Sequence, residues 1–198
     1  MLIDTHAHLD LPEFEGDLSD VIQRAHDAGV TTIGTVGIDP PSCQRALEIA
    51  DAYPGVFAIV GIHPHHAAEI GEEDLVILKE LARHPKVKAW GEIGLDFYRN
   101  LSPPAIQEER FRQQIQIGTK LGLPLVIHSR SAARETIAVL RQEGAGAYGG
   151  VIHCFSGDAQ TAAAYLEMGF VVSIPGVITF SKARGLREVV KDLPLDSL

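Results

Sequence analysis

The sequence of 198 residues has only two cysteines, Cys43 and Cys154, and no long run of apolar residues. Two cysteines are too few for a disulfide scaffold, and these two lie too far apart for a zinc knuckle. The amino terminus has no basic segment followed by an apolar one, so it does not resemble a secretory signal. No apolar run approaches the length that spans a membrane. These absences predict a cytoplasmic protein in a reducing compartment.

Positive charge is also scarce, because 17 Lys and Arg residues stand against 26 Asp and Glu residues, for a formal net charge of −9. This balance argues against a broad basic face for nucleic acid, although a small cluster of Arg and Lys could still bind phosphate. The hydrophobic share of 45% is typical of a chain that forms an ordinary core. No Pro/Ser-rich linker, low-complexity tract or charge block divides the chain. We therefore predict a single domain over residues 1–198.

Seven short apolar runs recur along the chain, and each is followed by polar residues and then by a segment with helical spacing. The runs lie at 2–5, 31–36, 56–62, 87–90, 123–127, 151–152 and 170–174. Because the apolar positions are continuous rather than alternating, each run is predicted to be a strand that is buried on both faces of a parallel sheet. Strands and helices alternate roughly every 30 residues, which is typical of βα units.

Two architectures compete for this pattern, an open doubly wound sheet and a closed (β/α)₈ barrel. No glycine-rich phosphate turn follows the first strand, which disfavours the doubly wound sheet. Polar side chains at the carboxyl ends of several strands favour the barrel, because barrel enzymes place their chemistry there. The chain supplies seven strands where a barrel has eight. The predicted fold is α/β, a (β/α)₈ TIM barrel that lacks its eighth strand and final helix.

Metal-binding side chains end four of the seven predicted strands. His6 and His8 end the first, Glu92 the fourth, His128 the fifth and His153 the sixth. In a barrel these strand ends meet at one mouth, so the pattern predicts a divalent metal site. Four imidazoles and a carboxylate exceed what one tetrahedral ion needs, which favours two ions about 3.5–4 Å apart with Glu92 bridging them. Imidazoles favour zinc or manganese, and magnesium could bind through the carboxylate and substrate oxygens. Such a site predicts hydrolytic chemistry.

Several motifs, in order, resemble those of the TatD family of metal-dependent deoxyribonucleases. They are THAHLD at 5–10, GIHPH at 61–65, GEIGLD at 91–96, HSR at 128–130 and HCFSG at 153–157. Gln107, Phe111 and Gln114 match that family's helix before the fifth strand. The resemblance implies a barrel of the amidohydrolase type that hydrolyses phosphodiester bonds with divalent metals. It also implies DNA as the substrate and His6, His8, Glu92, His128 and His153 as the metal ligands.

The family's last motif, a Glu-Thr-Asp at the end of strand eight, has no counterpart in these 198 residues. Its aspartate is similar to the one that orients or deprotonates the attacking water in this type of barrel. Loss of such a base typically costs 10²–10⁴-fold in rate. We therefore expect the 198-residue chain to be C-terminally incomplete, slow as a nuclease and inclined to self-associate through its open strand edges.

Three further residues are candidates for substrate binding. His63 and His65 follow the third strand, and each is predicted either to contact a substrate phosphate or to be an ordinary turn residue. Arg130 lies two residues after His128, and its fixed fork suits a phosphate. Asp96 is expected to brace the loop or a ligand, whereas Cys154 is expected in the core.

Three functions remain open at this point. The first is a nuclease that removes nucleotides, exonucleolytically, from single-stranded or frayed DNA. The second is another ester or amide hydrolase on the same scaffold, such as a D-aminoacyl-tRNA deacylase. The third is a catalytically weakened fragment that retains its metals. We infer no obligate protein partner and no membrane partner from the sequence.

Overall fold

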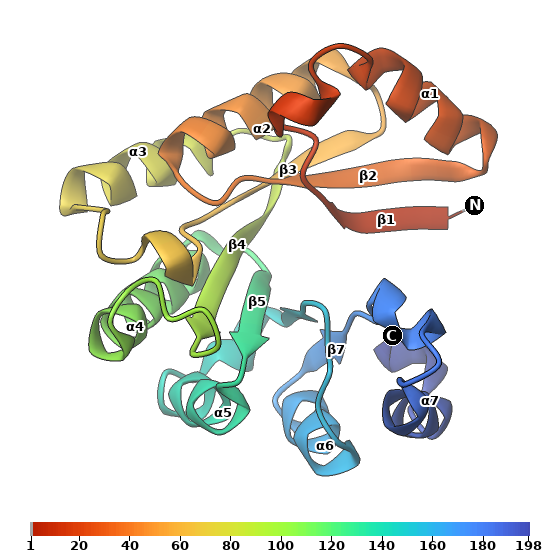
Figure 1. The fold of residues 1–198 in the computed structure, drawn as a ribbon. Helices are drawn as coiled ribbons and strands as arrows, with labels where there is room; N and C mark the ends of the chain where they lie inside the picture. Colours follow the sequence, from red (N-terminus) through yellow and green to blue (C-terminus); the bar gives the residue numbers. More distant parts are fainter. Residues whose placement is uncertain (1) are drawn as a thin grey trace.

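The computed structural model describes residues 2–198, which form one curled parallel sheet with helices along its outer side (Figure 1). The seven strands are parallel neighbours in chain order, as the sequence predicts. Their bounds are β1 Leu2–Ala7, β2 Val30–Val36, β3 Val56–Val60, β4 Val87–Asp96, β5 Leu125–Arg130, β6 Gly150–Ile152 and β7 Phe170–Val172. The sheet is thus the predicted α/β arrangement of a barrel that stays open between β1 and β7.

Within residues 2–198, seven α-helices and five short 3-10 helices lie between and after the strands. The α-helices are α1 Leu18–Asp27, α2 Pro40–Ala52, α3 Glu72–Leu81, α4 Pro104–Leu121, α5 Ala133–Gln142, α6 Ala159–Glu167 and α7 Arg184–Lys191. The 3-10 helices are Pro12–Phe14, Pro64–His66, Ala145–Tyr148, Gly176–Thr179 and Leu195–Ser197. No helix within residues 2–198 is both long and apolar enough to cross a membrane.

Local sequence signals fix several helix ends. Asp39 and Ser42 form a capping box at the start of α2, where Pro40 occupies a first-turn position that needs no donor. Asp158 accepts a hydrogen bond from the Thr161 N–H and so caps α6. At the other end of α4, Gly122 adopts the left-handed conformation (φ 69°) that glycine tolerates best. The caps thus fix where α2 and α6 begin, and Gly122 lets the chain turn from α4 toward β5.

Both faces of the central strands are covered, as their continuous apolar residues predict, whereas residues 2–5 of β1 at the open edge are exposed, so the predicted burial is wrong there. The larger core lies between the sheet and the helices and contains Trp90, Phe111 and Tyr165, each no more than 1% exposed. A second cluster uses the alternate residues of the inner strands, on the opposite, concave face. Its members are Val36, Ile59, Ala89 and Val126.

Strand β4 differs from the prediction because it continues beyond Glu92 and ends at Asp96. Trp90 pairs with Leu125 but Ile93 pairs with Ile127, so β4 has one extra residue at this point, a β-bulge. The bulge turns Glu92 out of the regular alternation of the strand. A Cβ at Gly91 would lie 2.6 Å from Val126, so glycine permits the close approach of the two strands here.

Strand β1 has the same irregularity beneath His6. Asp4 pairs with Ile33 and Ala7 pairs with Thr35, which leaves one extra residue in β1. A bulge redirects the side chains around it and increases the local twist. Two of the four register shifts in the described sheet thus lie where predicted metal ligands emerge; the other two lie between Leu2 and Ile3 and between Ala58 and Ile59.

Two buried glutamines of α4 fix the backbone at the carboxyl ends of β3 and β4. Gln114 accepts a hydrogen bond from the Ile62 N–H (2.8 Å) and donates one to the Ile62 carbonyl (3.0 Å). Gln107 accepts from the Asp96 N–H (2.8 Å) and donates to the Ser102 carbonyl (2.6 Å). Because both side chains are buried, these amides replace the water that would otherwise satisfy the strand ends.

Gln114→Leu should therefore destabilise the protein. It leaves the N–H and the carbonyl of Ile62 buried without partners, at a cost of about 1–3 kcal/mol for each group. We expect the free energy of unfolding to fall by roughly 2–6 kcal/mol in urea denaturation. Gln116→Leu, at an exposed position of the same helix, is the matched control. Equal effects of the two substitutions would show that the Gln114 bridge is not what holds the strand end.

Candidate metal centre

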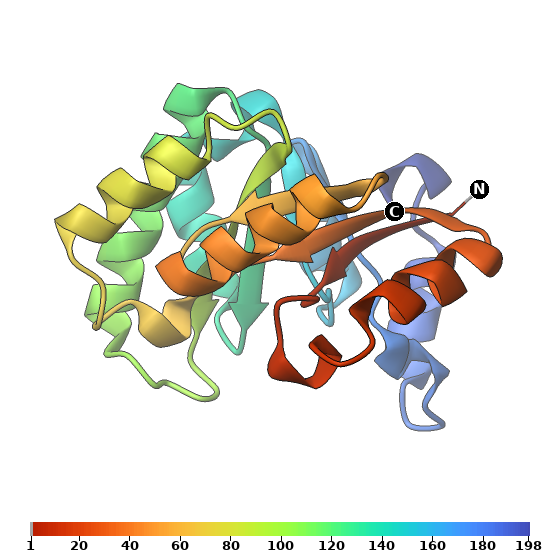
Figure 2. The ribbon, with the colours of Figure 1, turned by 90° about the horizontal axis from the view of Figure 1, so that it is seen from above.

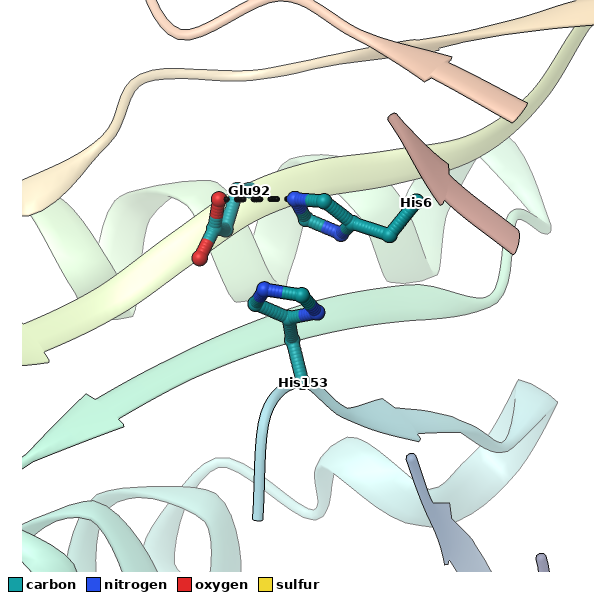
Figure 3. A group of neighbouring side chains, drawn as sticks. All are labelled: His6, Glu92 and His153. Atoms are coloured by element: carbon teal, nitrogen blue, oxygen red, sulfur yellow. Dashed lines mark ion pairs between the residues drawn. The ribbon is translucent and has the colours of Figure 1, made fainter. Parts of the chain in front are cut away.

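Glu92 is buried on β4 and lies between two groups of histidines. Its Oε2 is 3.2 Å from the Nε2 of His6, which follows the bulge of β1. The ring of His153, just after β6, stacks on the His6 ring with centroids 3.4 Å apart. Figure 3 shows these three side chains converging from separate strands. Their ligand atoms lie within 4.8 Å of one another, a spacing that could hold a metal ion.

The other oxygen of Glu92 faces the second group. Its Oε1 is 2.8 Å from the Nδ1 of His128 and 4.0 Å from the Nε2 of His63. Glu92, His63 and His128 also place one ligand atom each within 4.8 Å of one another. The two carboxylate oxygens therefore point to two different sets of imidazoles, which is the arrangement that a bridging ligand requires.

The surroundings of His6 fit a metal ligand. Both ring nitrogens are buried, and neither has a hydrogen-bond partner of good geometry among the described residues. A buried nitrogen without a partner is costly, and native structures rarely leave one without a reason. A cation would use the lone pair that no protein group here uses.

His8 lies beside this arrangement but outside both groups. Strand β1 ends at Ala7, and the Nδ1 of His8 lies 2.9 Å from the carbonyl oxygen of Val36. The centroid of its ring is 5.1 Å from that of His6. A backbone carbonyl at Nδ1 leaves the Nε2 of a neutral His8 free to act as a ligand. The ligand role of His8 stays a prediction.

Asp96 braces the second group from behind, as the sequence suggested. Its Oδ2 lies 3.1 Å from the Nε2 of His128 and 2.9 Å from the Nε2 of His65. Its Oδ1 accepts hydrogen bonds from the backbone N–H groups of Tyr98 and Arg99. Glu92 and Asp96 both only accept, so each of them is satisfied by an N–H of His128, whose ring is held between the two carboxylates.

The charge balance keeps both carboxylates ionised. Burial acts to raise the pKa of Glu92, but contacts with His128 and His6 outweigh it and hold that pKa well below its usual range. Burial likewise acts to raise the pKa of Asp96, and hydrogen bonds from the Arg99 N–H, His65 and His128 lower it overall. Burial acts to lower the pKa of His128, but Glu92 and Asp96 raise it overall.

Two other imidazoles are held neutral. Burial lowers the pKa of His63 to about 3, and the attraction of Glu92 offsets this only in part. Burial, reinforced by the proximity of the His6 imidazole, lowers the pKa of His153 to about 4. Both rings therefore present lone pairs at neutral pH, as a metal ligand must.

A pocket of about 470 Å³ opens above Glu92, and its lining includes His8, His63, His128, Arg130 and His153. The predicted substrate contacts differ in their access to it. Arg130 lines the pocket and is exposed, and its guanidinium carbon lies 4.1 Å from the ring centroid of Tyr98. His63 is buried beside Glu92, whereas the Nε2 of His65 is engaged by Asp96 and His65 does not line this pocket.

Two sequence-based assignments change. The expectation that Cys154 packs in the core is wrong, because the residue is exposed. It adopts a left-handed conformation (φ 52°) just after His153, which breaks the alternation on which the expectation depended. His63, which was assigned only to the substrate, belongs to one of the two possible metal groups. Its place at the end of β3, next to the strand of Glu92, is the signal that could have indicated this.

Comparisons with known proteins agree with this geometry. A family model described as TatD related DNase matches residues 3–198. The chain is 44% identical to "Uncharacterized metal-dependent hydrolase YabD" of Bacillus subtilis (strain 168), covering all of this chain and 78% of that protein. It is 38% identical to "3'-5' ssDNA/RNA exonuclease TatD" of Pantoea vagans, covering all of this chain and 76% of that protein. The crystal structure of YJJV, a TatD homolog from Escherichia coli K12, superposes with a TM-score of 0.94 at 33% identity, covering 100% of this chain and 76% of that one.

The neutral histidines make the metal-free protein sensitive to acid. The pKa of His63 is about 3 in the folded chain and about 6.5 in an unfolded one. Below pH 6.5 the unfolded state therefore binds a proton that the folded state does not bind until about pH 3. As the pH is lowered through this window, the free energy of unfolding decreases by up to about 1.4 kcal/mol per pH unit for each such group. His128 acts in the opposite direction, because its raised pKa stabilises the fold below 6.5 and this contribution is lost as pH rises through the folded pKa.

We expect His63→Gln to reduce the loss of stability between pH 6.5 and 4.5, measured by urea denaturation in the presence of a chelator. His26→Gln, at an exposed position of α1, is the control and should keep the wild-type pH dependence. An unchanged slope in His63→Gln would mean that the buried ring takes up its proton as readily in the folded state as in the unfolded one.

Proposed function

The chain belongs to the TatD-related DNase family of metal-dependent hydrolases, and from this premise we propose that it hydrolyses phosphodiester bonds in DNA with two divalent metal ions. The observation that carries the proposal is Glu92, whose two oxygens face separate groups of imidazoles. Two ions held there would polarise a phosphoryl oxygen and lower the pKa of a coordinated water. The ligands we propose are His6, His8, Glu92, His128 and His153.

His63 is a further candidate ligand for the second ion, which is supported by its position beside Glu92 and His128. Five imidazoles around one carboxylate favour zinc or manganese, and magnesium could act through Glu92 and the substrate oxygens. Asp96 fixes the ring of His128 from behind, so that Nδ1 faces Glu92. Side chains of this kind, one step behind a ligand, typically contribute 10–100-fold to metal affinity or activity.

Single-stranded or frayed ends are the substrate that we favour. A net charge of −9 gives no broad basic surface for duplex DNA, so affinity must come from the metals and a few cationic side chains such as Arg130. The Pantoea relative carries the name of a single-strand exonuclease. The guanidinium of Arg130, on the rim of the pocket, suits a phosphate of the same strand. Since His65 is already bound to Asp96, we favour Arg130 and His63 over His65 as substrate contacts.

Glu92→Ala should lose at least one of two bound ions, because it removes the only carboxylate that faces both groups within the described residues. We expect elemental analysis to find about two divalent ions per chain in the wild type and a clear deficit in the variant. Glu143→Ala removes a carboxylate that pairs with Arg112 on the surface and is the control. If Glu92→Ala kept both ions tightly bound, the bridging role would be wrong.

A substrate panel tests the reaction itself. We expect end-labelled single-stranded DNA to shorten progressively from one end in the presence of manganese, while a D-aminoacyl ester stays intact. A chain extended by a strand that ends in Glu-Thr-Asp should be faster by about 10²–10⁴-fold and less prone to associate in light scattering. Cleavage of the ester without cleavage of the oligonucleotide would replace the nuclease by a deacylase. Bound metal with no turnover in either form would indicate a silent binding protein.

A further inference from the structure

One exposed aromatic ring lies against Arg130, a residue that lines the metal pocket. This ring belongs to Tyr98, which lies two residues after the end of β4 and is 65% exposed. The guanidinium carbon of Arg130, at the end of the neighbouring β5, lies 4.1 Å from the centroid of the Tyr98 ring. With one face covered by the guanidinium, this exposure leaves much of the remaining ring surface open to solvent.

The ring is held in a fixed place relative to the metal ligands. The backbone N–H of Tyr98 donates to Oδ1 of Asp96 (3.0 Å), and Oδ2 of the same carboxylate lies 3.1 Å from the Nε2 of His128. The N–H of Phe97 donates to the carbonyl of Arg130 (2.9 Å), so the loop is also tied to β5. One buried carboxylate therefore positions both an imidazole of the site and the aromatic residue beside Arg130.

The guanidinium of Arg130 is available to a ligand. Among residues 2–198 it forms no ion pair within 4.0 Å with any carboxylate. It also lines the pocket that contains Glu92. An aromatic ring stacked with an arginine is a common platform for nucleobases, because every base presents a flat face and the cation strengthens the contact.

We propose that Tyr98, backed by Arg130, stacks a nucleobase of single-stranded nucleic acid next to the phosphodiester that the metal site hydrolyses. The inference rests on the proposed function and deepens it by naming the part of the substrate that is bound. Stacking is little affected by salt or by the sign of the protein's charge. It therefore supplies affinity that an acidic protein cannot obtain from the phosphate backbone.

Binding is tested without turnover. The single tryptophan, Trp90, is fully buried, so Tyr98→Trp adds an exposed indole as a reporter. We expect a short single-stranded phosphorothioate oligonucleotide to quench the fluorescence of this variant, and an abasic oligonucleotide of the same length to quench it far less. Tyr148→Trp is the matched control, since Tyr148 is 55% exposed but precedes β6 at the opposite end of the strands. Equal quenching by the intact and abasic strands would overturn the proposal.

Turnover gives a second readout. Tyr98→Ala should raise KM for the oligonucleotide by about 5- to 150-fold, the range expected for one base on one aromatic ring. Tyr98→Phe should preserve KM because it keeps the ring. kcat and the metal content should change little in either variant. An abasic site at the stacked position should raise KM of the wild type and add nothing in Tyr98→Ala.

The outcomes separate the two ideas. If the wild type degrades oligonucleotides but Tyr98→Ala behaves like Tyr148→Ala, the nuclease proposal stands and the stacking site is wrong. If Tyr98→Ala loses metal together with activity, the residue is structural and the stacking site is again wrong. If the wild type cleaves no oligonucleotide, the nuclease proposal fails, and the fluorescence experiment still decides whether a base binds at Tyr98.

Discussion

The burial of Glu92 is the constraint on which the rest of the site depends. A carboxylate that is 3% exposed loses most of its hydration, and an isolated buried charge would cost several kcal/mol. The contacts of its two oxygens with His128 and His6 offset this cost and keep the group ionised. Those contacts require imidazoles from β1 and β5 to meet over β4, and only the curvature of the sheet allows residues so far apart in the sequence to do so.

The polar groups around Glu92 are linked by a chain of hydrogen bonds. Asp96 holds His128 and His65 with one oxygen and the following loop with the other. Gln107 in turn holds the backbone of Asp96. Buried polar networks of this kind fix a unique geometry only when every member has a partner. The exceptional member is His6, whose ring nitrogens lack good partners, and the fit to a cation is clearest at this residue.

Much of the fold could be predicted from the sequence, because continuous apolar runs, helix caps and a regular alternation are local signals. The central strands are buried on both faces, and all seven strands overlap the runs that predicted them, although β1 is largely exposed and β4 continues to Asp96. The details of the site were less accessible. The bulges at His6 and Glu92 depend on pairing with neighbouring strands, and no local sequence pattern predicts them. The alternation of side chains along the strand also gave the wrong prediction for Cys154, because the backbone is left-handed at this residue.

Folding and metal binding should be coupled in this protein. Without a cation, the site holds two ionised carboxylates, two imidazoles kept neutral by burial and a third whose nitrogens are unsatisfied. The unsatisfied nitrogens of His6 are a cost that the folded chain bears and the unfolded chain avoids, and below pH 6.5 the neutral imidazoles add to it. A ligand that binds only the folded state stabilises it by RT ln(1 + [L]/Kd), which is about 2.7 kcal/mol when the free ligand exceeds Kd by about a hundredfold. The imidazole nitrogens that lack protein partners are therefore the groups that would give an ion its affinity.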